Sequence, residues 1–273
     1  MTSDEIIIFD DIEISQYEKI IESSLKYAII SIPFTYNRMD KDALEQRIIN
    51  IAKGKISEGL FKLFCVKNQI QISTAECKTP FYKPDKKDFV LNAYEWDIKN
   101  NYLYHQDDLL DLSQYLRLPA LIPSKTIYSQ WSKRNEKKIG NSKGIKFLFT
   151  FMKNLDKYQK GRNFINLLLD NSQKEFIVAI YEKHNSLNYK YANYSEDWYW
   201  NEFFKASDNK QIMYSVLHYP KLVITGFADE SNWDKFVNLK PTKISNGLMN
   251  TIIPNKACRI EKLPSLKKLI FSV

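Results

Sequence analysis

The amino-acid sequence predicts a mixed α/β protein organised around a β-sheet. Segments with apolar residues at helical spacing alternate along the chain with short, strongly apolar segments typical of buried strands. The chain has 273 residues, of which 44% are apolar and 26% charged, as in most folded globular proteins. Helices and strands that alternate in this way favour a mixed α/β sheet protein.

Two helices are expected at the start of the chain. Residues 15–29 place apolar side chains at helical spacing, and Pro33 is expected to end this helix because an interior proline removes a backbone hydrogen bond. A second helix is expected from about residue 40 to residue 67, where Leu44, Ile48 and Ile51 begin an apolar stripe.

The rest of the chain divides into further strands and helices. Strands are expected at 68–73, 88–91, 94–104, 145–152, 175–183 and 221–227. Helices are expected at 161–170 and, more briefly, at 230–237.

Charge favours a polyanionic partner such as nucleic acid, since the net charge is +8. Most of that charge lies in residues 124–146, which hold seven basic residues against one acid. Five of these basic residues are candidates for DNA phosphate contacts: Lys125, Lys133, Arg134, Lys137 and Lys138.

The cysteines and the N-terminus favour a cytoplasmic protein. Cys65, Cys77 and Cys258 lie far apart without zinc-ligand spacing, and scattered thiols indicate a reducing compartment. The acidic N-terminus lacks the cationic region of a secretory signal. No apolar run approaches the ~18 residues that span a bilayer, so no membrane partner is expected.

The expected strand at 94–104 carries an unusual charged face. Glu95, Asp97 and Lys99 share one face because side chains alternate along a strand, while Trp96 and Ile98 occupy the other. One interpretation is an exposed strand with a surface ion pair, which contributes only ~0–1 kcal/mol. The other is a functional site that the apolar pair anchors in the core.

Neighbouring residues favour the functional site. If the strand at 88–91 folds back at residues 92–93, Asp88 approaches the middle of the charged strand. The preceding helix holds Glu58 between Gly54 and Gly59. Glycine inside a helix costs stability, so the two glycines suit a position where another group approaches the helix closely, around Glu58. Asp88, Asp97 and Glu58 would give a hard cation such as Mg²⁺ the oxygen ligands that it prefers.

This set of residues fits metal-assisted hydrolysis of a phosphodiester. A bound Mg²⁺ polarises the phosphate and lowers the pKa of a bound water. Lys99 adds positive charge where the phosphate develops negative charge, and it could orient the attacking water.

The ordered set resembles the PD-(D/E)xK nuclease superfamily, and within it the type II restriction endonucleases. The matching residues are Glu58 in "GKISEGLF", Asp88 in "DFVLNAYE", and Asp97-Ile98-Lys99, so the resemblance covers roughly residues 45–101. It implies a central mixed β-sheet flanked by helices, dependence on Mg²⁺ (with Mn²⁺ as a substitute ion) and cleavage of double-stranded DNA.

Two positions of the motif have rivals nearby. The literal Pro-Asp pair ends at Asp85, which lies in a polar turn, whereas Asp88 adjoins the apolar strand and is preferred. Glu45 is an alternative to Glu58 but lies farther from the glycines.

A second acid-x-lysine triplet, Glu76-Cys77-Lys78, lacks an acid-led strand just before it. Glu95 also lies on the charged face, and two roles are open for it: a further metal ligand, or a residue that supports a metal ligand.

The expected protein is therefore a single nuclease domain over residues 1–273. Its catalytic core would span about 40–155, with an elaboration for DNA recognition or dimerisation at about 156–220. A restriction enzyme would act as a homodimer on palindromic DNA and would have a cognate DNA methyltransferase as genetic partner. The alternatives are a structure-specific repair or mobile-element nuclease, and a non-catalytic DNA-binding protein.

Overall fold

A computed structural model describes residues 1–35, 43–77, 79–82, 87–123, 145–155, 163–186, 195–207 and 209–271. Its α-helices are α1 (Ile14–Thr35), α2 (Leu44–Lys67), α3 (Leu112–Arg117), α5 (Asn171–Ser186), α6 (Glu196–Lys205) and α7 (Leu266–Phe271). Short 3₁₀ helices are η1 (Ser3–Glu5), η2 (Ala75–Cys77), η4 (Glu230–Lys235), η5 (Ser245–Gly247) and η6 (Ile260–Lys262).

A five-stranded mixed sheet forms the centre of the molecule, in the order β1-β8-β5-β3-β2. Its strands are β1 (Ile7–Phe9), β2 (Phe89–Leu91), β3 (Tyr94–Leu103), β5 (Ile145–Lys153) and β8 (Leu222–Ala228). Only β3 and β5 run parallel, and the other neighbours are antiparallel. The predicted mixed α/β fold with a central sheet is confirmed.

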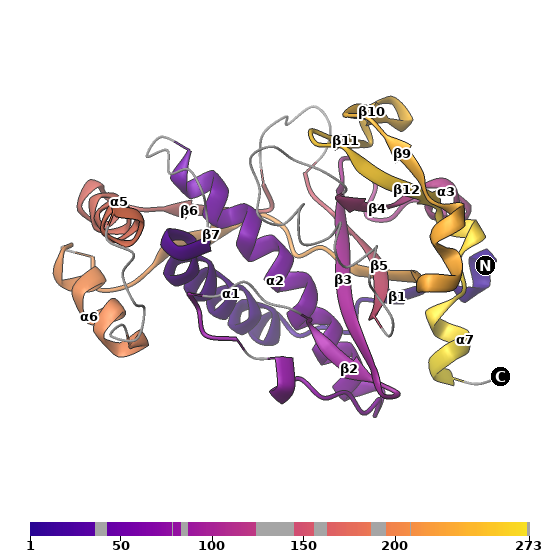
Figure 1. The fold of residues 1–273 in the computed structure, drawn as a ribbon, viewed down its shortest axis with the longest axis horizontal. Helices are drawn as coiled ribbons and strands as arrows, with labels where there is room; N and C mark the ends of the chain where they lie inside the picture. The colour runs from indigo at the N-terminus through magenta and orange to yellow at the C-terminus, as the bar shows by residue number, and fades with distance from the viewer. Residues whose placement is uncertain are drawn as a thin grey trace.

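The smaller sheets lie outside the central one. One contains β4 (Pro119–Pro123), β12 (Asn255–Arg259) and β9 (Val237–Leu239); two ribbons pair β10 (Thr242–Ile244) with β11 (Met249–Thr251) and β6 (Ile165–Leu168) with β7 (Met213–Val216). In Figure 1, α1 and α2 lie to one side of the central strands, and the β4-β12-β9 sheet lies to the other.

Two hydrophobic cores follow from this layering, because each face of the central sheet is covered. Trp96 and Leu148 belong to the core that includes α1 and α2. Phe147 and Phe149, which alternate with Leu148 along β5, belong to the core shared with β4 and β12.

Helix α1 continues past Pro33 to Thr35, so the prediction that Pro33 ends it was wrong. A proline at this position leaves the Ile29 carbonyl without its usual backbone donor. The buried Tyr199 hydroxyl of α6 donates to that carbonyl at 3.0 Å. A tertiary contact therefore replaces the missing hydrogen bond, which a local pattern could not indicate.

The predicted helix at 161–170 and the predicted strand at 175–183 were both wrong. The first segment contains the strand β6, whose burial alternates along Ile165–Leu168, and the second lies within the helix α5. Asp170 and Gln173 cap the start of α5 reciprocally, since Gln173 N donates to Asp170 Oδ1 at 2.8 Å and Asp170 N to Gln173 Oε1 at 3.2 Å. Buried positions in α5 then recur at Gln173, Ile177 and Ile180, which is helical spacing.

The expected strand at 68–73 is also absent from the structure, which has only an isolated antiparallel bridge there, between Ser73 and Val90. Asn68 and Gln69 instead form a turn after α2, and Gln69 has a φ of 57°. The short helix expected at 230–237 is present as η4. In the described ranges, none of the helices is both long enough and apolar enough to cross a membrane.

Candidate active site

The hairpin of β2 and β3 brings Asp88 to the charged strand, as predicted. Asn92 and Ala93 form its two-residue turn with φ values of 51° and 63°, the combination that matches the twist of the flanking strands. Asp88 N donates to Trp96 O at 2.8 Å, and Ile98 N donates to Asp88 Oδ2 at 2.6 Å. The side chain of Asp88 therefore extends the pairing of the hairpin by one step and is held by the backbone of β3.

Alternation along β3 separates the apolar anchor from the charged pair. Trp96 is fully buried on the side of the sheet that faces α2. Lys99 Nζ donates to Asp97 Oδ1 at 2.9 Å, and the two side chains are only 15% and 11% exposed. Lys99 Nζ also lies 5.6 Å from the centre of the Phe147 ring. This largely buried pair differs from the exposed ion pair that a purely structural surface strand would carry.

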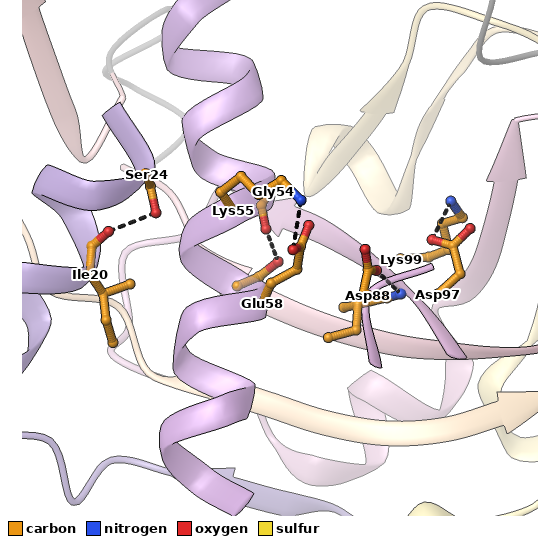
Figure 2. Close-up of polar contacts among 10 residues, drawn as sticks. Ile20, Ser24, Gly54, Lys55, Glu58, Asp88, Asp97 and Lys99 are labelled. Atoms are coloured by element: carbon orange, nitrogen blue, oxygen red, sulfur yellow. Dashed lines mark hydrogen bonds and ion pairs between the residues drawn. The ribbon is translucent and has the colours of Figure 1, made fainter. Parts of the chain in front are cut away.

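Glu58 approaches the hairpin from α2. Its carboxylate accepts from Lys55 Nζ at 2.8 Å and its side chain is 15% exposed. Figure 2 shows Glu58, Asp88 and Asp97 in a row, with Lys55 beside Glu58 and Lys99 beside Asp97. We call these three carboxylates the acid row. The structure thus places the predicted catalytic residues Glu58, Asp88, Asp97 and Lys99 in one row, with Asp97 and Lys99 on the face of β3 opposite Trp96 and α2.

The centre of the acid row is unfavourable for negative charge. Burial raises the pKa of Asp88 well above its usual range, and the charges of Glu58 and Asp97 raise it further. The charge of Lys55 and the hydrogen bond from Ile98 N oppose this rise without cancelling it. A cation placed against Asp88 would relieve the repulsion between the three carboxylates.

The residues fit Mg²⁺ by their chemistry. No three His, Cys, Asp or Glu side chains converge closely enough to hold a metal ion within the ranges that the structure describes. Mg²⁺ is commonly held by one or two carboxylates, with water and substrate phosphate completing its coordination. Asp88 and Asp97 are neighbours in the acid row, where the charge of Asp97 acts on Asp88, and could supply those two. The predicted third ligand, Glu58, stays a prediction.

The two glycines of α2 differ in what surrounds them. A Cβ on Gly59 would lie 2.6 Å from Ile20 Cγ2, so Gly59 allows α1 to pack closely against α2. A Cβ on Gly54 would meet nothing within 4 Å. The close approach expected around Glu58 is therefore a helix–helix contact.

The rivals for motif positions lie elsewhere or outside the described residues. Glu45 accepts from Leu169 N at 3.0 Å and pairs with Lys174 at 3.0 Å, thirteen residues before Glu58 in the same helix. Glu76 is exposed in η2. Asp85 and Lys78 fall outside the residues that the structure describes, as do Lys125, Lys133, Arg134, Lys137 and Lys138.

Glu95, whose role the sequence left open, forms an ion pair with Lys87 at 2.8 Å.

Two lysines that sequence reasoning did not single out lie beside the acids of the motif. Lys55 precedes Glu58 by three residues, a helical spacing that places them together, and Lys87 directly precedes Asp88. Those spacings were the available signals.

Comparison with known proteins adds no assignment to this geometry. No family model, curated protein or solved structure matches the chain.

Proposed function

We propose that the protein is a Mg²⁺-dependent endonuclease that hydrolyses phosphodiester bonds of double-stranded DNA. The observation that carries the proposal is the acid row, which has Asp88 between Glu58 and Asp97 and the ammonium of Lys99 at 2.9 Å from Asp97. A row of three carboxylates that ends in a largely buried Asp97–Lys99 pair is unusual unless it serves a ligand, because burying charge is costly.

Each residue of the set has a role that its contacts support. Asp88 and Asp97 would hold the metal ion, and the hydrogen bond from Ile98 N keeps one Asp88 oxygen in place. Bound Mg²⁺ would supply a polarising charge to the phosphate and to a coordinated water. Lys99, oriented by Asp97, would stabilise negative charge that develops on the phosphate oxygens. Glu58 would accept a hydrogen bond from the attacking water or from a water on the ion.

The finer proposal is a sequence-specific type II restriction enzyme that acts as a homodimer, with a DNA methyltransferase as its genetic partner. The residues of the acid row act on the phosphodiester backbone, which is the same in every sequence, so specificity rests on contacts with base edges elsewhere. The pattern of DNA fragments therefore separates this proposal from the alternatives.

The test is digestion of several unrelated plasmids by the purified protein, with Mg²⁺ and with a chelator. Wild type should give discrete fragments with Mg²⁺ only, whereas Asp97→Ala and Lys99→Ala should give none. Glu45→Gln and Lys174→Gln are matched controls. Each breaks the Glu45–Lys174 ion pair, whose burial is similar to that of the Asp97–Lys99 pair and which lies about 20 Å from Glu58 along α2. Both variants should cut like wild type.

Each other outcome has a defined meaning. Cleavage into fragments unrelated to sequence favours a structure-specific repair or mobile-element nuclease. DNA binding without cleavage, unaffected by Mg²⁺, favours a non-catalytic DNA-binding protein. Equal cleavage by wild type, Asp97→Ala and Lys99→Ala would remove the acid row from the reaction.

A further inference from the structure

A cavity of about 500 Å³ opens beside the acid row, and none of the roles assigned to the acid row requires it. Its walls come from α1, α2, the start of α6 and the segment before β2, and its carboxylates are Glu58, Asp88 and Glu196. Small-ligand sites in proteins commonly measure about 300–1,000 Å³. One nucleotide fits such a space, whereas a duplex does not.

The lysines that line this cavity are not equivalent. Lys55 pairs with Glu58 and Lys87 pairs with Glu95, each at 2.8 Å. Lys62 forms no hydrogen bond or ion pair with any residue in the part of the chain that the structure describes. The cavity therefore contains one cation whose charge the described carboxylates do not use.

The position of Lys62 links it to the acid row. It follows Glu58 by four residues on α2, so the two side chains lie on one face of the helix about one turn, or ~5.4 Å, apart. Gly59 between them lets Ile20 of α1 close the wall of the cavity behind this face. A strand whose scissile phosphate lies at Asp88 would thus bring a neighbouring phosphate towards Lys62.

The charge of Lys62 also reaches another wall of the cavity. Burial raises the pKa of the Cys77 thiol in η2, and the charges of Lys87 and Lys62 oppose that rise. Lys62 is partly buried and lines the cavity, so its ammonium is near any anion held there.

We propose that this cavity binds one nucleotide of the DNA strand being cut, with Lys62 contacting the phosphate next to the scissile one. The inference rests on the proposed nuclease function, because it takes DNA as the ligand and the acid row as the place of cleavage. Lys62 is then a positioning residue: it fixes the register of the strand without touching the reacting atoms.

The test measures binding of a fluorescently labelled DNA duplex in a chelator, over a series of salt concentrations. Lys62→Gln should weaken binding and reduce the slope of log affinity against log salt by about 0.9, the loss of one phosphate contact. Lys62→Arg should restore the slope. Lys19→Gln, on the exposed face of α1 and outside the cavity, is the matched control and should bind like wild type.

A second variant approaches the same cavity from the opposite helix. Ser23 lines the cavity but is exposed, so Ser23→Phe narrows the space without disturbing the core. It should also weaken DNA binding, while thermal unfolding of both variants stays like that of wild type. If Lys62→Gln and Ser23→Phe bind DNA with wild-type affinity and salt slope, the inference is wrong.

Failure of the inference and failure of the nuclease proposal give different results. If the wild type cleaves with Mg²⁺ and Lys62→Gln matches it in binding and in KM, only the nucleotide cavity is excluded. If no DNA is cleaved but binding depends on Lys62, the nuclease proposal is excluded and only the phosphate contact of Lys62 is kept, without a scissile phosphate beside it. The expected result is a raised KM for Lys62→Gln with kcat close to wild type.

Discussion

Lys53 of α2 offers a prediction about stability whose magnitude follows from the structure. The residue is buried, its ammonium donates to Asn163 Oδ1 at 3.1 Å, and it lies 4.2 Å from the centre of the Tyr102 ring. Burial lowers the pKa of Lys53 from an ordinary 10.5 to about 8. A difference of about 2.5 between the two values corresponds to about 3 kcal/mol against folding with the lysine charged.

The sign of the pH dependence follows from where the proton binds more tightly. The unfolded chain holds the Lys53 proton up to about pH 10.5, and the folded chain releases it near pH 8. The penalty is therefore complete below about pH 8 and disappears as pH rises towards 10.5, so this group makes the protein more stable with rising pH. Lys53→Met removes the penalty at every pH but also loses the hydrogen bond to Asn163, about 1 kcal/mol.

The assay is urea unfolding of wild type and Lys53→Met from about pH 7 to about pH 10. The free energy of unfolding of wild type should gain about 2–3 kcal/mol relative to the variant over this range. Lys26→Met, which changes a half-exposed lysine of α1, should keep a constant difference from wild type. A pH-independent difference between wild type and Lys53→Met would refute the argument for a penalised buried cation.

Two further predictions concern the packing of α2 and the role of Glu95. Gly59→Ala should destabilise the protein by about 1–3 kcal/mol in urea unfolding, because its Cβ would lie 2.6 Å from Ile20 Cγ2. Gly54→Ala, with nothing within 4 Å, should instead stabilise it by up to about 1 kcal/mol; equal effects of both changes would contradict the close packing of α1 at Gly59. Glu95→Gln should leave DNA cleavage nearly unchanged, because Glu95 is occupied by Lys87; loss of cleavage comparable to that of a metal-ligand variant would assign Glu95 to the metal.

The β2–β3 hairpin was predictable because its determinants are local. Asp88 adjoins an apolar strand, a two-residue turn at Asn92 and Ala93 reverses the chain, and alternation on β3 sets Asp97 and Lys99 on one face. The burial of the Asp97–Lys99 pair was not predictable from these residues, since it depends on β5 lying alongside β3.

Segments that depend on distant partners were predicted less well. The apolar run at 163–170 suits a helix or a strand equally, and its antiparallel pairing with β7, some fifty residues later, makes it a strand. Helix α5 buries Gln173, which a pattern based on apolar residues does not count as a core position. The cavity beside the acid row lies where α1 packs on α2, so the place of Lys62 in its wall could not be predicted from the position of Lys62 in the sequence.

The most direct test of the proposed active site is the single-turnover rate of DNA cleavage with Mg²⁺ at saturating protein. Asp88→Asn and Asp97→Asn keep the size of each side chain but remove the negative charge that would hold the ion. We expect each variant to lower the rate by at least about a hundredfold, with DNA binding in a chelator unchanged and Glu45→Gln at the wild-type rate. Cleavage by both variants at the wild-type rate would contradict the assignment of the acid row as the active site.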